Sequence, residues 1–177
     1  MSSRLGLAAA LVCATALIAG CAPSAEPTPT KTAAFASEDE AFAAAEKTYR
    51  AYVDALNNVD LADPATFEDV YKWAIGDRLA GDKKALTSYY AQGATMSGAS
   101  DVVVLEPMTA NDALSSITLA ACVDVSTVDI RDDDGQSLVA ADRPDVQSIQ
   151  VELIGDESSV SGFLVTSVAG RAGSPTC

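Results

Sequence analysis

The fold is decided first by the stretch Ser37–Leu56, which reads SEDEAFAAAEKTYRAYVDAL. Its first four residues form a capping box, in which the Ser37 side chain accepts from the amide three residues on and Glu40 reaches back to the Ser37 amide. Apolar residues then recur at three- and four-residue steps, as they do along one face of a helix. They are Phe42, Ala45, Tyr49, Tyr52, Val53 and Leu56. The stretch predicts a long helix with one buried face that ends at Asn57 and Asn58.

Two further helices are predicted before residue 93. Asp63-Pro64 is a start signal because proline is tolerated in the first helical turn, and Gly76 is the expected end of this short helix. A third helix is expected from about Arg78, with Gly93 as its C-terminal cap. The first half of the domain is therefore expected to be helical.

Beyond residue 93 the pattern changes to the two-residue alternation of β-strands. Strands are predicted at Asp101–Glu106, Ser116–Ile130, Val146–Ile154 and Val160–Val168. Pro107 is expected to end the first of them. Helices followed by a meander of strands predict an α+β fold. Because one helix face and one sheet face are apolar, we expect the N-terminal helices to be packed in a curved antiparallel sheet.

The chain begins with the pattern of a lipoprotein signal peptide. Arg4 provides a positive charge, Leu5–Leu17 is an uncharged apolar run, and Ile18–Cys21 is a lipobox. The apolar run is too short for a membrane-spanning helix, which needs ~20 residues. We therefore expect residues 1–20 to be removed and Cys21 to carry diacylglycerol. The Pro-, Thr- and Ala-rich residues 21–36 are expected to be a linker, and residues 37–177 a single domain.

Composition excludes several kinds of function. The chain has 177 residues, a formal net charge of −14 and no histidine. Excess acid argues against binding to nucleic acid or to anionic lipid headgroups. The lack of histidine excludes Ser-His and Cys-His catalytic pairs and removes the usual zinc ligand. We expect no cofactor.

One acidic run, Asp132–Gly135, is similar to part of a calcium-binding loop. An EF-hand loop with Gly135 at its glycine position would begin at Ile130 and end at Ala141, and neither residue can ligate calcium. We therefore expect a solvated turn with Asp-Gly at its corner, and no metal site.

The cysteines indicate an oxidising compartment. Cys13 lies in the signal peptide and Cys21 is the expected lipidation site, which leaves Cys122 and Cys177. In an exported protein a disulfide between such a pair is the default expectation. Two unrelated thiols are the alternative. A disulfide would hold the last residue of the chain against an interior strand.

Several short features of the domain occur together. They are the Ala-Cys-Val-Asp run at Ala121–Asp124, the Asp134-Gly135 turn, Arg143, the closing pair of strands and the terminal Cys177. With its order of elements, the sequence resembles small actinobacterial lipoproteins that have an NTF2-like (SnoaL-like) cone fold. The resemblance covers residues 37–177. It implies a shape and not a chemistry, because members of this fold include isomerases, dehydratases, hydrolases and non-catalytic scaffolds.

The resemblance also implies candidate pocket residues. In a cone of this type, aromatic residues of the helices can line an internal pocket, and isomerase-like members use a pocket carboxylate and a tyrosine. The candidates here are Tyr49, Tyr52, Trp73 and Tyr89, with Asp124 on the facing strand as acid or base. The alternative is that the aromatic residues belong to the core and that Asp124 points at water.

Two functions stay open from the sequence. The first is an extracytoplasmic module, anchored in the membrane through diacylglycerol on Cys21, that binds or scaffolds an unidentified envelope protein without catalysis. The second is a small-ligand pocket or an enzyme that uses Asp124 and a tyrosine. A two-lobed solute-binding protein of a transport system is disfavoured because the chain has the length of one domain.

Overall fold

The computed structural model describes residues 35–177. The predicted signal peptide, Cys21 and nearly all of the predicted linker lie outside this range. The described elements are α1 (Glu38–Asn57), a 3-10 turn (Pro64–Thr66), α2 (Phe67–Tyr71), α3 (Gly76–Ala91), β1 (Thr95–Ser97), β2 (Asp101–Ala110), β3 (Ser116–Asp124), β4 (Asp129–Arg131), β5 (Val146–Gly155) and β6 (Phe163–Gly170). They belong to one compact unit.

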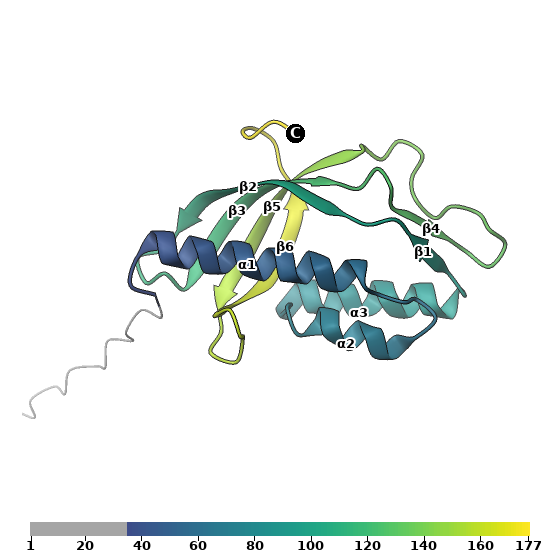
Figure 1. Cartoon of the computed structure of the whole chain (residues 1–177), viewed down its shortest axis with the longest axis horizontal. Coiled ribbons are helices and arrows are strands. Elements are labelled where there is room, and N and C mark those ends of the chain that lie inside the picture. The colour runs from purple at the N-terminus through teal and green to yellow at the C-terminus, as the bar shows by residue number, and fades with distance from the viewer. Residues whose placement is uncertain (1–34) are drawn as a thin grey trace, which may run out of the picture. The chain divides into compact units, whose positions relative to one another are not determined.

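The strands form a four-stranded antiparallel sheet of order β2-β3-β5-β6 and a two-stranded ribbon of β1 and β4. The long helix α1 crosses one face of the sheet, and α2 and α3 lie towards the C-terminal end of α1 (Figure 1). The sheet is curved around α1. The α+β class and the packing of helices in a curved antiparallel sheet are confirmed.

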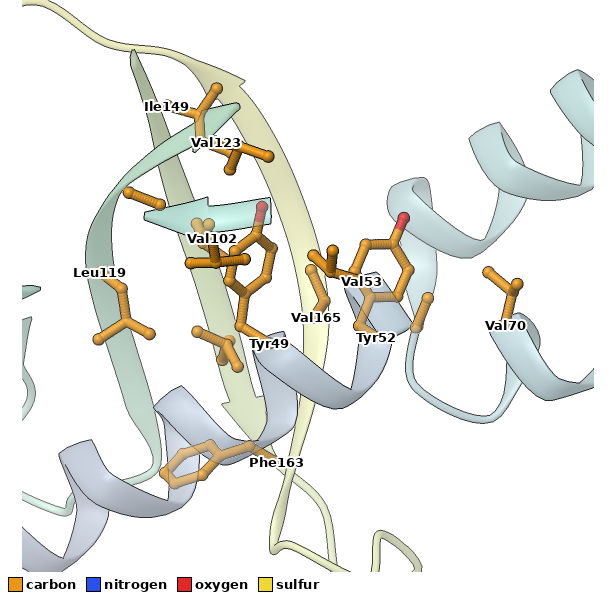
Figure 2. Packing of buried hydrophobic residues seen from close by; sticks show 14 of the residues in the cluster. Tyr49, Tyr52, Val53, Val70, Val102, Leu119, Val123, Ile149, Phe163 and Val165 are labelled. Carbon is orange, nitrogen blue, oxygen red and sulfur yellow. The ribbon is translucent and has the colours of Figure 1, made fainter. Parts of the chain in front are cut away.

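The core lies between α1 and the inner face of the sheet. Helix α1 contributes Tyr49, Tyr52 and Val53, and alternate residues of the strands point towards them (Figure 2). The strand residues include Val102, Ile117, Leu119, Val123, Val151, Leu153, Phe163 and Val165. The alternation predicted for β3 is confirmed, because Ile117, Leu119, Ala121 and Val123 all belong to this core. Cys122 and Asp124 lie on the other face of the strand.

The start of α1 is held by its cap and by an aromatic contact. The Ser37 hydroxyl accepts from the Glu40 amide at 3.2 Å, as the capping box predicts. The Glu40 carboxylate accepts from the Ala36 amide at 2.8 Å instead of the Ser37 amide. Phe35 stacks on Phe163, with ring centroids 4.9 Å apart. The chain therefore enters the domain beside the β5–β6 turn.

The prediction that Gly76 ends the second helix is wrong, because α2 ends at Tyr71 and Gly76 begins α3. The segment between them pairs with the edge of the sheet: the Val165 amide donates to Trp73 O and the Ile75 amide donates to Val165 O, each at 2.9 Å. Gly76 then adopts a φ of 60°, which glycine tolerates without strain. The chain turns there from a short β-bridge into a helix. Gly93, also at a φ of 60°, follows the end of α3 as predicted.

Several strand boundaries also differ from the prediction. The last strand begins at Phe163 and not at Val160, because Val160 belongs to the exposed turn between β5 and β6. Strand β2 continues through Pro107 to Ala110, because β2 is an edge strand with bulges, where a missing amide donor is tolerated. The predicted strand Ser116–Ile130 is divided into β3 and β4. At the division the Val125 amide donates to Asp145 O, and β4 leaves the main sheet to pair with β1, which the sequence did not predict.

The C-terminal tail returns to the outer face of the sheet, opposite α1 (Figure 1). There Cys177 forms a disulfide with Cys122, with their Cα atoms 5.5 Å apart. The expected turn at Asp132–Gly135 is also present, since the Gly135 amide donates to Asp132 O and the Gln136 amide to the Asp132 carboxylate. Within residues 35–177, none of the helices is both long and apolar enough to cross a membrane.

Candidate functional site

A charged cluster lies between α1 and α3, inside an otherwise apolar region. Asp82 of α3 is only 2% exposed. Its two carboxylate oxygens accept from the Tyr52 hydroxyl of α1 at 2.9 and 3.1 Å. One of them also accepts from Arg78 Nη2, one helical turn earlier on α3. Tyr52, Arg78 and Asp82 form what we call the Asp82 cluster.

Two side chains of the cluster, Tyr52 and Arg78, are held in defined protonation states. Burial raises the pKa of Tyr52 well above its ordinary value, and the hydrogen bond to Asp82 contributes in the same direction. The hydrogen bond to Asp82 also raises the pKa of Arg78. Tyr52 is therefore a neutral hydrogen-bond donor and Arg78 a cation. The charge of Arg78 balances the buried carboxylate, as a buried charge requires.

The cluster leaves one polar atom without a partner. Arg78 Nε is buried and has no hydrogen-bond acceptor among the described residues. The Arg78 guanidinium lies over the Tyr52 ring, 5.8 Å from its centroid, so it is held between the ring and the carboxylate.

Beside the cluster is a cavity of about 200 Å³. Arg78 and Asp82 form its charged wall, and Tyr89 of α3 also lines it. The other lining residues come from the end of α1, from α3, from the β1–β4 ribbon and from the loops between them. They are Leu56, Asn57, Val59, Leu61, Ala85, Leu86, Met96, Gly98, Ser100, Val128 and Ile130. We call this space the Arg78 cavity.

The pocket residues predicted from the sequence are only partly brought together. Tyr49 and Tyr52 are both in the core, with ring centroids 6.2 Å apart. Figure 2 shows the Tyr49 ring beside Val102 and the Tyr52 ring on the side of Val70. Burial raises the pKa of Tyr49 as well. Tyr89 lines the Arg78 cavity, whereas Trp73 lines a separate depression of about 520 Å³ with Tyr71, Val160 and Leu164.

Asp124 lies apart from these tyrosines. It occupies the end of β3, on the face of the sheet that carries Cys122, whereas Tyr49 and Tyr52 pack against the opposite face. Its carboxylate accepts from the Ser126 amide at 2.8 Å. Hydrogen bonds from Ser126 hold the pKa of Asp124 below its ordinary value. The carboxylate that meets a tyrosine in this structure is that of Asp82.

Sequence reasoning missed Arg78 and Asp82 as site residues. Their signal is a spacing: Arg78, Asp82 and Leu86 follow one another at four-residue steps, so they lie on one face of α3. A charged pair in line with a core leucine indicates a buried ion pair. Within residues 35–177, no group of three or more Cys, Asp or Glu side chains is arranged to hold a metal ion.

A larger depression, about 640 Å³, lies on the outer face beside the C-terminal tail. It is lined by residues of β5, β6 and the tail, among them Ile149, Val168, Arg171 and Cys177. Arg171 is occupied there by the tail, since it donates to the Ser174 and Pro175 carbonyls. The Arg78 cavity is therefore the better candidate, because it combines apolar walls with two charged side chains, Arg78 and Asp82.

Comparison with known proteins gives similarity of fold. No protein-family model matches the chain, and none of the curated proteins matches it. The intermembrane space region of the chloroplast protein ARC6 superposes with a TM-score of 0.50 at 12% identity, covering 73% of this chain and 95% of that one. A putative aromatic ring hydroxylase from Novosphingobium aromaticivorans gives 0.49 at 14% identity, covering 76% and 96%. An IcmL-like type IV secretion system protein from Legionella pneumophila gives 0.45 at 14%, covering 80% and 96%. At these identities the likeness concerns the fold alone.

Proposed function

We propose that this protein is an extracytoplasmic lipoprotein, anchored in the cell membrane by diacylglycerol on Cys21, whose domain binds or scaffolds an envelope protein without catalysis. In this proposal residues 1–20 are the signal peptide, 21–36 the linker and 37–177 the domain. The lipobox Ile18–Cys21 and the short apolar run before it support the anchor.

The observation that carries the proposal is the disulfide between Cys122 and Cys177. Disulfides persist in oxidising compartments and are rare in the cytosol. Cys122 and Cys177 thus form a disulfide, as cysteines of exported proteins commonly do. This use agrees with the export signal that the first residues carry, although the two features are independent of each other.

The chemistry of the candidate site favours binding over catalysis. Asp82 is already matched by Arg78 and by the Tyr52 hydroxyl, so it is a poor general base. Burial keeps Tyr52 protonated. Asp124, which would be the acid or base of an enzyme of this fold, lies on the other face of the sheet and is tied to Ser126.

The first described residue and the Arg78 cavity lie at opposite ends of α1. Phe35 stacks on Phe163 at the N-terminal end of α1. The helix has 20 residues and so spans ~30 Å. Leu56 and Asn57, at its other end, line the Arg78 cavity. The β1–β4 ribbon and the Arg78 cavity therefore lie at the end of α1 opposite to Phe35 (Figure 1).

The proposal is tested by mass spectrometry and fractionation of the protein in its native host. The wild-type chain should be found in the membrane fraction, with a mature N-terminus at Cys21 that carries a lipid-sized mass increment. Cys21→Ala should give a chain without the increment. Cys13→Ala is the matched control, because it changes a cysteine of the signal peptide and should leave acylation intact.

An unmodified mature N-terminus in the wild type, or acylation that survives Cys21→Ala, would refute the anchor. Non-reducing peptide mapping of the same sample checks the compartment, since Cys122 and Cys177 should be recovered in one linked fragment. Alkylation of both thiols without prior reduction would contradict export to an oxidising compartment.

A further inference from the structure

We propose that residues 171–177 form a strap that is released by reduction. The disulfide between Cys122 and Cys177 fastens this strap to the outer face of the sheet, and a protein dithiol that reduces the bond frees the strap while the domain stays folded. We call residues 171–177 the C-terminal strap. The inference goes beyond the anchoring and scaffolding role and does not depend on the lipid anchor. It gives the outer face of the sheet a closed and an open state.

The disulfide is what holds the far end of the strap. At its first residue, the Arg171 amide donates to Ser148 O at 2.9 Å, and Arg171 Nε donates to Ile149 O at 3.4 Å. In the part of the chain that the structure describes, no hydrogen bond joins residues 172–176 to the sheet. The next tie to the sheet is the covalent bond of Cys177 itself.

The other hydrogen bonds of Arg171 stay within the strap. Its guanidinium donates to Ser174 O at 2.5 Å and to Pro175 O at 2.6 Å. These bonds fold the strap back on its own first residue and add nothing to its hold on the sheet. Once the disulfide is broken, Arg171 is the hinge about which the remaining strap residues move.

The disulfide lies outside the core of the domain. Cys122 is buried on the outer face of β3, whereas its neighbours Ala121 and Val123 belong to the core between α1 and the inner face. The contacts of that core do not involve the crosslink. Loss of a disulfide usually costs less than the whole stability of a domain of this size. The domain should therefore stay folded when the bond is reduced.

The exchange begins at Cys177, which is an exposed residue at the end of the chain. Exposed disulfides are the ones that exchange with thiols. A thiolate of the dithiol attacks Cys177 Sγ, the bond to Cys122 Sγ breaks, and Cys122 leaves as a thiolate that takes up a proton. The second thiol then displaces Cys177, so the dithiol is oxidised to a disulfide and both cysteines are reduced.

Release of the strap changes the outer face of the sheet. Cys122 is paired across the strands with Val104 of β2 and Ser148 of β5, so these three side chains share one face. Thr176 and Cys177 form part of the wall of the depression of about 640 Å³. Without the strap this wall is lost and the Cys122 thiol is uncovered. The open state thus presents an uncharged strip across three strands.

Reduction of the folded protein is the first test. The protein is the whole chain from residue 21 onward with Cys21→Ser, so that Cys122 and Cys177 are its only cysteines. Dithiothreitol without denaturant should make both thiols available to alkylation and leave the far-UV circular dichroism unchanged. The heteronuclear NOE, which reports fast backbone motion, should fall at the Gly173 and Thr176 amides and stay constant at Leu119 in the core.

Three results of this test would overturn the inference. The first is a disulfide that dithiothreitol reduces only in the presence of denaturant. The second is loss of the circular dichroism signal on reduction, because the crosslink would then hold the whole fold. The third is an unchanged heteronuclear NOE at Gly173 and Thr176 in the reduced protein, because the strap would then stay closed without the bond.

Thiol labelling then shows whether the outer face is uncovered. In the same chain, Cys177→Ser leaves Cys122 as the only thiol, and iodoacetamide should modify it nearly as fast as it modifies the same variant in urea. The matched control is Ala121→Cys in a chain with Cys122→Ser and Cys177→Ser, because residue 121 is next to Cys122 but faces the core. Its thiol should react at least roughly a hundredfold more slowly than in urea, since core groups are exposed only by larger unfolding.

Equal protection of the two thiols would show that the strap stays in place without its disulfide, and would overturn the inference. If Cys177→Ser does not fold, the reduced wild type replaces it, because mass spectrometry of its peptides gives the labelling rate of Cys122 separately from that of Cys177.

Discussion

The Tyr52 hydroxyl is the only hydrogen-bond donor that α1 gives to Asp82 in the described chain. It lies in the core, and its ring supports the Arg78 guanidinium while its hydroxyl holds the carboxylate. One side chain thus contributes apolar packing and part of the charge compensation of a buried acid. Ionising this tyrosine would place a second negative charge next to Asp82.

Alkaline pH should therefore destabilise the fold. The pKa values of Tyr49 and Tyr52 are raised in the folded state, whereas in the unfolded chain each tyrosine titrates near pH ~10. Below that pH their contribution is fully present. Above it the unfolded chain binds fewer protons than the folded one, so the free energy of unfolding falls by about 1.4 kcal/mol per pH unit for each tyrosine.

Urea unfolding at a series of pH values measures this slope. Between about pH 10 and 12, the free energy of unfolding of Tyr52→Phe should fall with pH less steeply than that of the wild type, by about 1.4 kcal/mol per pH unit. Tyr90→Phe is the control, because Tyr90 is 49% exposed, and it should keep the wild-type slope. Identical slopes for the two variants would contradict the buried, protonated state of Tyr52.

The β1–β4 ribbon depends on one glycine of the loop that joins β1 to β2. Gly98 has a φ of +78°, and a Cβ on it would lie 1.9 Å from Thr127 O. The backbones approach closely there because Ala99 and Thr127 are joined by two hydrogen bonds, of 3.2 and 3.0 Å. The loop before β2 is thereby held against the chain that leads into β4.

Gly98→Ala should consequently loosen the ribbon and the cavity. Gly135→Ala is the matched control, since Gly135 has a φ of +79° with no atom near its would-be Cβ. The control should cost about 1–2 kcal/mol of unfolding free energy, for the left-handed backbone alone. Gly98→Ala should cost at least about 3 kcal/mol and speed hydrogen exchange at Met96 and Ile130. Equal costs would show that the close approach to Thr127 is not a constraint.

The elements that periodicity predicts well are those whose pattern is local. The apolar stripe of α1 and the alternation in β3 follow from residues close in sequence, and both are confirmed. The end of α2, the passage of β2 through Pro107 and the division after Asp124 depend on distant partners instead. Gly76 begins a helix because the segment before it pairs with Val165, which is far from it in the sequence.

The candidate site was predictable only in part for the same reason. Tyr52 and Tyr89 are aromatic residues on predicted helices, and the sequence alone marks them. Their carboxylate could not be chosen, because the resemblance to the cone fold suggests Asp124 whereas the contact is made by Asp82 of α3. Which carboxylate accepts a hydrogen bond from Tyr52 depends on how α1 and α3 pack against each other. The sequence of either helix alone does not predict that packing.

Across the whole domain, the two ends of the described chain are both tied to the sheet. Phe35 stacks on Phe163 of β6 at one end, and Cys177 is bonded to Cys122 of β3 at the other. The second tie spans 55 positions and encloses β4, β5 and β6. The disulfide therefore holds the C-terminal end of the chain against the central part of the sheet.

Removing the disulfide should lower stability mainly through the unfolded chain. A loop of this length corresponds to about 4 kcal/mol in the chain-entropy model, with 2–4 kcal/mol typical of measured disulfides. The double variant Cys122→Ala with Cys177→Ser is compared with the oxidised wild type by urea unfolding. Because a chain without the crosslink exposes more surface when it unfolds, the denaturant slope m should also increase. The reduced wild type is the control and should match the variant in both values. A variant as stable as the oxidised wild type, or a loss of stability with an unchanged m, would mean that packing around Cys122 and not the crosslink sets the effect.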